Sequence, residues 1–289
     1  MKKLIIWLCV VSLCACMLSC HKKPKISSIR IAYSDFAFDK SVIYIISNII
    51  SAQTELKVEL IQVPESDLVK SLVDNRADLC FSLWAPNTHA DLISAYKDSI
   101  DLISPYLEDI RPGLAVPEYS GIKSIEDINT LTLPEKMIIC PDSTNVLNQI
   151  SQQVITGYNL TGYNLKTMNR EVDILNLAKE KYEKSENFII ATYRPHWLFA
   201  DLKMVLLNDS QKAFGTPEKA VIYSRKGFEK DLPKIVAFLK QIKLTMDDVE
   251  ALMKSNESEN SDPKVNAQTW VDANIDRINL WINKANENK

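Results

Sequence analysis

The chain has 289 residues, which corresponds to about two domains at roughly 150 residues each and gives ample material for buried cores. With 46% hydrophobic residues, 25% charged residues, 6 Gly and 12 Pro, the composition is that of a globular protein and excludes a collagen-like or linker-dominated chain. The formal net charge of -3 provides no basic field of the kind that holds nucleic acid, so we expect no nucleic acid partner.

The first 20 residues predict export and a lipid anchor. Two lysines precede a nearly unbroken apolar run at 4–18, as in a signal peptide, and this run is shorter than the ~20 residues of a membrane-spanning helix. It ends in Met-Leu-Ser-Cys20, which resembles the lipobox of bacterial lipoproteins and implies lipidation of Cys20. We expect 1–19 to be a lipoprotein signal peptide and 20–28 a lipidated tether on the periplasmic or cell-surface side of a bacterial membrane. An ordinary signal peptide cut near Ser19 or Cys20 is the alternative.

The cysteines do not form a disulfide framework. Three of the 6 Cys lie in the signal and Cys20 is assigned to lipid, which leaves Cys80 and Cys140. Each of them ends an apolar run, so we expect two separate thiols at strand ends rather than a disulfide.

Strands and helices alternate after the tether. Apolar periodicity predicts a strand, a helix, a strand, a helix and a strand, in that order, at 29–33, 41–51, 57–63, 66–73 and 77–83. This order predicts the α/β class, with a mostly parallel sheet covered by helices on both faces. Ligands of such sheets bind beyond the carboxyl ends of the strands, here 33–38 and 84–89.

A second unit with the same alternation begins near Gly113. We expect strands at 137–140, 188–192 and 219–224 and helices at 144–154, 172–182, 233–243, 245–254 and 266–283. The last three helices come without new strands. We therefore expect them to pack back onto the first unit.

No motif for catalysis or metal binding accompanies these elements. The chain lacks G-x-S-x-G, H-E-x-x-H, C-x-x-C and the glycine-rich runs that cradle phosphate. Only His89 and His196 are available in the body of the chain. His89 suits a helix start, a cleft wall or a ligand contact, and a structural hydrogen bond is favoured for His196. We expect no enzyme activity, no cofactor and no metal site.

Aromatic residues mark the ends of two predicted strands. Trp84 follows the strand at 77–83, and Tyr193 and Trp197 follow the strand at 188–192. Core packing is one interpretation of such residues. The other is that the two clusters face each other across a cleft, where ring faces attract a cation by about 1 to 2 kcal/mol per desolvated ring. That interpretation predicts a ligand with a soft, poorly hydrated cation.

Three segments carry a specific resemblance. They are Ser82–His89, Gly113–Tyr119 together with Ser124–Ile128, and Tyr193–Phe199. In this order they resemble the glycine-betaine-binding proteins of osmoprotectant ABC importers, the OpuAC-like family. The resemblance runs from about 29 to 281.

The resemblance implies a two-lobed periplasmic-binding-protein fold of type II, in which the chain crosses twice between the lobes. The crossovers would fall near 110–118 and 214–221. Lobe 1 would then consist of 29–112 and 218–289, and lobe 2 of 113–217.

The family binds the trimethylammonium group of its ligand among aromatic rings. Trp84 matches one of these rings, and Tyr193 stands where the family usually has Trp. The third ring falls at Leu244, which supplies none. Three aromatic residues near the end of the first strand are candidates to replace it, namely Tyr33, Phe36 and Phe38.

The family binds the carboxylate of its ligand with backbone N–H groups beside a helix start. These groups match Phe36 and Ala37, and Phe36 replaces the usual glycine. Asp142, in a turn that is glycine-rich in relatives, would add negative charge if its side chain faces the cleft. Such a charge would favour a purely cationic ligand such as choline.

The resemblance implies a lipid-anchored, extracytoplasmic solute-binding protein that captures glycine betaine or a related quaternary ammonium compound. It would deliver this ligand to the permease and ATPase of an ABC importer. One alternative is the same fold with choline, carnitine or another amine, and another is a lipoprotein that senses or scaffolds. The expected ligand-binding residues are Tyr33, Phe36, Ala37, Phe38, Trp84, His89, Tyr193, His196 and Trp197.

Overall fold

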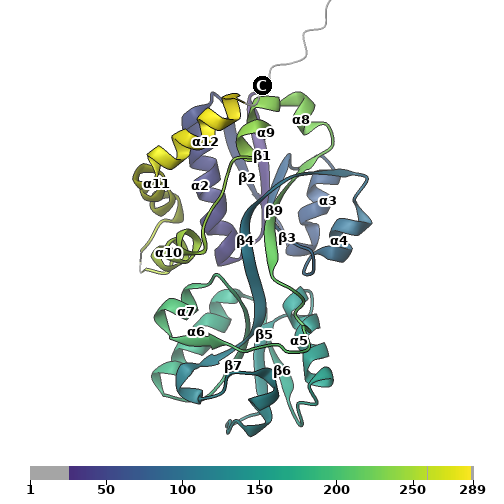
Figure 1. The fold of residues 1–289 in the computed structure, drawn as a ribbon, viewed down its shortest axis with the longest axis vertical. Coiled ribbons are helices and arrows are strands. Elements are labelled where there is room, and N and C mark those ends of the chain that lie inside the picture. Colours follow the sequence, from purple (N-terminus) through teal and green to yellow (C-terminus); the bar gives the residue numbers. More distant parts are fainter. Residues whose placement is uncertain (1–25, 259, 288–289) are drawn as a thin grey trace, which may run out of the picture.

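The protein has two lobes, one above the other in the view of Figure 1. A computed structural model describes residues 26–258 and 260–287. The predicted signal peptide, Cys20 and most of the predicted tether lie outside the described residues. Strands at the centre of each lobe are covered by helices on both sides, which confirms the predicted α/β class and the two-lobed fold (Figure 1).

The upper lobe begins with three strands in the order β2-β1-β3, paired in parallel. They are β1 (Ser28–Tyr33), β2 (Lys57–Gln62) and β3 (Leu79–Ala85), and the helices between and after them are α2 (Ala37–Gln53), the short η2 (Glu65–Asp67), α3 (Leu68–Val73) and α4 (Ala90–Ala95). Most of α2 is buried because the helix lies between the sheet and the C-terminal helices. Its run of isoleucines, typified by Ile45 and Ile46, fills the core of this lobe.

Two long strands connect the lobes. β4 (Ile100–Pro117) pairs with β9 (Glu218–Arg225) as far as Ile110 and then, from Arg111, with β7 (Ile189–Arg194) of the lower lobe. Both β4 and β9 run antiparallel to their neighbours, so four of the strand pairs are antiparallel and four are parallel. The prediction of a mostly parallel sheet was therefore wrong. The start of β4 was not predicted because its sequence, which includes Pro105, does not alternate regularly between apolar and polar residues. In the structure its pairing with β9 has three register shifts.

The lower lobe has the strand order β4-β7-β5-β6, with β8 on β4. Its further strands are β5 (Met137–Pro141), β6 (Asn164–Met168) and β8 (Met204–Leu206), and its helices and helical turns are η3 (Glu118–Ser120), η4 (Ile125–Thr130), α5 (Val146–Gly157), α6 (Glu171–Glu183) and α7 (Trp197–Asp201). β6 and β8 were not predicted, because both are short and only partly buried. α6 and α7 lie on one side of the strands and α5 on the other (Figure 1).

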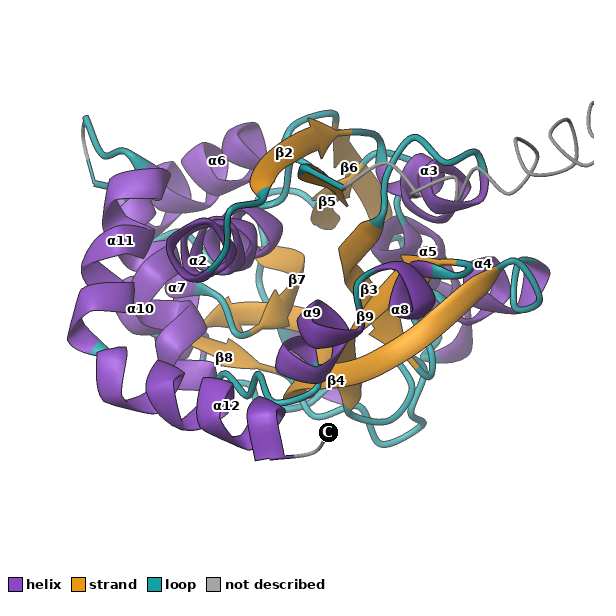
Figure 2. Ribbon diagram, turned by 90° about the horizontal axis from the view of Figure 1, so that it is seen from above, coloured by secondary structure: helices purple, strands orange, loops and turns teal. Residues whose placement is uncertain are grey.

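The C-terminal helices return to the upper lobe, as predicted. They are α8 (Phe228–Asp231), α9 (Pro233–Leu239), α10 (Met246–Asn256), α11 (Pro263–Ala273) and α12 (Ile275–Glu287). α10 and α11 pack along α2, and α12 packs on α9, while α3 and α4 lie on the opposite side of the sheet (Figure 2). The single helix expected at 266–283 is in fact two helices. Asn274 divides them, and its side chain donates to the carbonyl of Trp270 at 2.9 Å.

The two cysteines of the body are buried and unpaired, which confirms two separate thiols. Cys80 lies in β3 and Cys140 in β5. Burial raises the pKa of Cys80 to about 12 and that of Cys140 to about 11, so neither forms a reactive thiolate near neutral pH.

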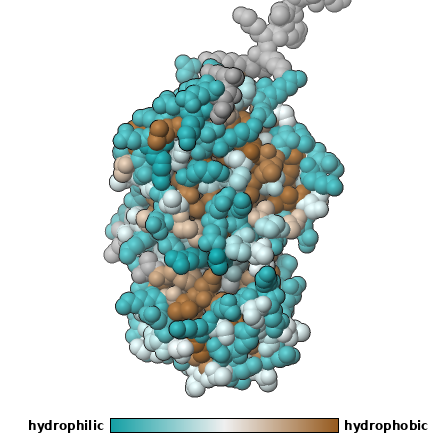
Figure 3. Space-filling view, viewed as in Figure 1, coloured by the Kyte–Doolittle hydropathy of each residue, from teal (hydrophilic) through white to brown (hydrophobic). Residues whose placement is uncertain are grey.

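The face of the molecule shown in Figure 3 is largely hydrophilic, with smaller apolar areas on both lobes. Across 26–258 and 260–287, the structure contains no helix with the length and apolar character needed to span a bilayer.

Candidate functional site

Three aromatic rings meet between the lobes. Trp84 near the end of β3, Phe38 in the first turn of α2 and Tyr193 near the end of β7 lie edge to face. The ring centroids are 4.9 Å apart for Trp84 and Tyr193, 5.3 Å for Phe38 and Trp84, and 6.3 Å for Phe38 and Tyr193. All three side chains are buried, and such ring pairs stabilise a fold by about 0.5–1.5 kcal/mol beyond the area that they bury. The rings come from both lobes, so they meet only when the lobes are together.

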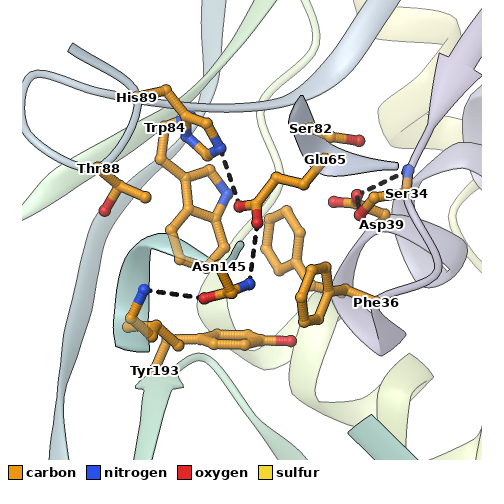
Figure 4. A pocket seen from close by; sticks show the side chains of 12 residues that line it. Ser34, Phe36, Asp39, Glu65, Ser82, Trp84, Thr88, His89, Asn145 and Tyr193 are labelled. Atoms are coloured by element: carbon orange, nitrogen blue, oxygen red, sulfur yellow. Dashed lines mark hydrogen bonds and ion pairs between the residues drawn. The ribbon is translucent and has the colours of Figure 1, made fainter. Parts of the chain in front are cut away.

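These rings form part of the wall of a small cavity (Figure 4). Its volume is about 30 Å³, which holds water molecules but not a quaternary ammonium group. The described residues that line it include no Lys or Arg. They are Ser34, Phe36, Phe38, Asp39, Glu65, Ser82, Trp84, Thr88, His89, Asn145, Leu147 and Tyr193.

Two carboxylates give this cavity a negative character. The Asp39 carboxylate in the first turn of α2 accepts hydrogen bonds from the backbone N–H of Ser34, at 3.1 Å, and from the Ser34 hydroxyl. Burial raises the pKa of Asp39 to about 6, although the hydrogen bonds from Ser34 oppose this shift. The Glu65 carboxylate accepts from the Asn145 amide at 2.9 Å, across the two lobes (Figure 4). A site with this charge favours a cation.

His89 orients the loop that carries Trp84. Its Nδ1 accepts the backbone N–H of Trp84 at 2.9 Å, so Nε2 carries the proton and donates to Glu65 at 3.2 Å. The residue also precedes the first turn of α4. His89 therefore stands both at a helix start and in the cleft wall, and it holds Trp84 and Glu65 in place.

The same loop is tied to β9 by a buried carboxylate. Glu218 is fully buried and accepts the backbone N–H groups of Asn87, at 2.9 Å, and Thr88, at 2.8 Å, together with the Thr88 hydroxyl, at 2.5 Å. The Asn87 amide donates to the carbonyl of Thr216 at 2.8 Å. The loop after Trp84 is thus fixed to the segment through which the chain returns from the lower lobe.

Five of the nine expected ligand-binding residues line the cavity. They are Phe36, Phe38, Trp84, His89 and Tyr193. Of the three candidates for a third ring, Phe38 packs against Trp84 and Tyr193, while Leu244 lies in the core and donates its N–H to the carbonyl of Tyr106.

The other four expected residues lie outside the lining. The Tyr33 hydroxyl donates to Gln62 at 3.3 Å, and the N–H of Ala37 donates to Glu171 at 2.7 Å. His196 caps α7 by accepting the N–H of Leu198 at 3.2 Å, as expected for a structural histidine, and Trp197 is fully buried beneath Lys179. The Asp142 carboxylate is held by Thr144 at the wider mouth of the cleft.

Sequence reasoning missed the polar residues of the site, which are Ser34, Asp39, Glu65, Ser82, Thr88, Asn145, Glu171 and Glu218. For three of them the sequence contained a pattern that could have identified them. Glu65, Asn145 and Glu171 each follow within four residues of the end of a strand that points toward the cleft, namely β2, β5 and β6. The rule that ligands bind beyond carboxyl ends applies to all parallel strands, but it was applied only to the ends of the strands at 29–33, 77–83 and 188–192.

The family of the chain follows from a match over nearly its whole described length. Residues 27–273 match the family described as the substrate binding domain of the ABC-type glycine betaine transport system. The chain belongs to this family. Its members are solute-binding proteins that act outside the cytoplasm and are not a class of enzymes. In the part of the chain that the structure describes, no cluster of three or more His, Cys, Asp or Glu is placed to hold a metal ion.

One curated relative is the glycine betaine/carnitine transport binding protein GbuC of Listeria monocytogenes. It is 26% identical over 133 residues, which is 45% of this chain and 44% of that protein. The match therefore spans less than half of the relative's length.

Solved structures of low sequence identity share the fold. Lactococcal OpuAC, in its closed-liganded conformation with glycine betaine, has a TM-score of 0.81 and 22% identity, covering 89% of this chain and 99% of that one. ProX from Borrelia burgdorferi has a TM-score of 0.80 and 20% identity, covering 90% and 98%. An ABC-transporter choline binding protein in complex with choline has a TM-score of 0.80 and 17% identity, covering 90% and 93%.

Proposed function

We propose that this protein captures a small quaternary ammonium compound between its lobes and delivers it to the permease of an ABC importer. The observation that carries the proposal is the set of aromatic rings from both lobes around a cavity that also holds two carboxylates (Figure 4). Ring faces attract a poorly hydrated cation, and buried carboxylates add to that attraction. Glycine betaine, carnitine and choline, which relatives and similar structures bind by name, are the first candidate cargoes.

The proposed capture step is closure of the lobes on the ligand. Trp84 and Phe38 belong to the upper lobe and Tyr193 to the lower one, and these rings now contact each other directly. The ligand therefore enters by separating them, and it stabilises closure because only the closed form brings all three rings onto it. Movement at the two crossovers, near 110–118 and 214–221, would turn 113–217 against 29–112 and 218–289.

The test of capture is a fluorescence titration of the chain that starts at residue 21. Glycine betaine, proline betaine, carnitine and choline are added in turn, and the tryptophan emission is followed. A saturable change with at least one compound, reduced in a Trp84→Phe variant, supports the proposal. A folded protein that binds none of the four in calorimetry contradicts it.

We further propose that a lipid on Cys20 anchors the protein outside the cytoplasm. The lipobox-like Met-Leu-Ser-Cys20 supports this step. In cell fractionation, Cys20→Ser should move the protein from the membrane to the soluble fraction, while Cys16→Ser within the signal should not. Retention of the Cys20→Ser protein in washed membranes would contradict lipid anchoring.

A further inference from the structure

The N-terminus of α2 is occupied by a carboxylate from the other lobe. The N–H of Ala37, the first residue of α2, donates to Oε2 of Glu171 at 2.7 Å. Glu171 begins α6 of the lower lobe. Phe36, at the N-cap position of α2, offers no side-chain hydrogen bond. Because the first N–H groups of a helix lack partners within the helix and carry partial positive charge, Glu171 acts as a cap that spans the cleft.

The Glu171 carboxylate is held in this position by further contacts. Its Oε1 accepts from the Tyr193 hydroxyl at 3.2 Å and lies 3.6 Å from Nε2 of His196. The side chain is 15% exposed. Tyr193 is itself one of the three rings of the cavity, so Glu171 is joined both to the helix terminus and to the aromatic wall.

This position is the one that the family resemblance assigned to the carboxylate of the ligand. A second carboxylate brought to the N–H of Ala37 would meet Glu171 at close range, in a largely buried position where like charges repel strongly. Asp39 and Glu65 line the adjoining cavity, whose described lining contains no Lys or Arg. The guanidinium of Arg170, at the mouth of the cleft, is already bonded to Asp173 at 2.8 Å. A zwitterion would find no free cationic partner for its carboxylate among these residues.

The cavity does offer groups that fit an uncharged polar tail. Nε1 of Trp84 is buried without a hydrogen-bond partner, and an N–H in that situation suits an oxygen acceptor. The Asp39 and Glu65 carboxylates accept hydrogen bonds and therefore suit a hydroxyl donor. A hydroxyl supplies both functions, whereas a carboxylate supplies only an acceptor.

We propose that Glu171 determines specificity by occupying the anion position at the N-terminus of α2. The site then selects ammonium compounds that carry a hydroxyl and rejects those that carry a carboxylate. This inference rests on the proposed function and narrows the class of its ligand. Glu171 acts as a fixed internal substitute for the carboxylate that a betaine would bring.

The experiment measures the ratio of two dissociation constants by calorimetry, with choline and glycine betaine as the probes. The chain from residue 21 is compared with its Glu171→Ala and Glu171→Gln variants. Glu171→Ala opens the anion position, and Glu171→Gln retains an acceptor for Ala37 without the charge. Weaker closure would change both constants together, so the ratio separates specificity from a structural role.

The matched control is Glu250→Gln. Glu250 also joins the lobes, through an ion pair with Arg194 at 3.2 Å, and is 16% exposed, but it lies away from the start of α2. This variant should leave the ratio of the constants unchanged.

We expect the unmodified protein to bind choline at least roughly tenfold more tightly than glycine betaine, and Glu171→Ala to shift the ratio at least roughly tenfold toward betaine. Glu171→Gln should shift it in the same direction. Tighter binding of betaine by the unmodified protein, or an unchanged ratio in Glu171→Ala, overturns the inference and leaves the proposed function intact. A folded protein that binds neither choline nor glycine betaine, proline betaine or carnitine overturns both.

Discussion

The indole of Trp84 and the phenol of Tyr193 contact each other edge to face, with their centroids 4.9 Å apart. One ring stands near the end of β3 in the upper lobe and the other near the end of β7 in the lower lobe. The contact therefore joins the two lobes, and under the proposed function a cation that separates the two rings would change the environment of Trp84.

Loss of the Trp84 ring should weaken ligand binding. Trp84→Leu keeps an apolar side chain but removes the aromatic face, so affinity for the preferred ammonium compound should fall by at least about 1 kcal/mol, or roughly fivefold. Trp84→Phe should lose less. Calorimetry gives the constants, and Trp270→Leu on α11 is the control because it removes a tryptophan outside the cavity. Equal affinity in Trp84→Leu and the unmodified protein would show that the ring does not touch the ligand.

Replacement of Asp39 should change how stability depends on pH. Burial raises its folded-state pKa from 3.8 to about 6, so the folded protein holds this proton more tightly than the unfolded chain. The protein should therefore lose about 3 kcal/mol of unfolding free energy as the pH rises from about 4 to about 6, and the loss should persist above that range.

Asp39→Asn lacks this titration. Its stability relative to the unmodified protein should rise across the same interval, and the variant should be the more stable of the two at pH 7.5. Urea unfolding at pH 4, 5, 6 and 7.5 measures the difference, which isolates Asp39 because all other titrating groups are shared. Parallel curves for the two proteins would mean that Asp39 does not titrate in this range.

Removal of the Glu218 carboxylate should destabilise the fold. Glu218→Ala leaves the N–H groups of Asn87 and Thr88 without their acceptor, at about 1–3 kcal/mol for each buried group, so we expect a loss of at least about 2 kcal/mol in urea unfolding. The control is Glu108→Gln, which breaks an exposed ion pair with Lys219 and should cost less than about 1 kcal/mol. Similar unfolding midpoints for the two variants would contradict a structural role for Glu218.

A methyl group at Gly215 should be poorly tolerated. Gly215 has φ +83°, and an added Cβ would lie 2.5 Å from Cγ of Asn87, whose amide is held by Thr216. Gly227 has a similar φ of +78° but open space around it. Both alanine variants carry the strain of a positive φ, about 1–2 kcal/mol, and only Gly215→Ala adds the clash. The melting temperature of Gly215→Ala should therefore be well below that of Gly227→Ala. Equal melting temperatures would show that the loop around Asn87 shifts to make room for the methyl group.

Much of the fold was predictable because the apolar periodicity of each segment agrees with the helix or strand that it forms. The strands at 29–33 and 57–63 pair with each other, and the apolar helix at 41–51 packs on them, so periodicity identified all three elements. The long strand β4 was not predictable in the same way. It pairs with β9 in the upper lobe and with β7 in the lower lobe, and both partners lie far from it in the sequence. Its prolines and register shifts follow from these pairings, which no short stretch of sequence reveals.

The aromatic part of the site was predictable for a related reason. A ring that directly follows an apolar strand stands at the edge of the sheet where ligands bind, and Trp84 and Tyr193 both satisfied this rule. Phe38 was one of three candidates for the third ring, and the structure brings it, rather than Tyr33, against the other two.

The sequence by itself predicted the family resemblance, the α/β class and the two strand ends that carry aromatic rings, because these depend on short motifs and on apolar periodicity. Only the tertiary structure decided the electrostatics of the site. The Glu171 carboxylate meets the N–H of Ala37, and the Glu65 carboxylate meets the amide of Asn145, across lobes that are far apart in the chain. Such pairs arise from the way the crossovers set one lobe against the other, and no local pattern in the chain records that geometry.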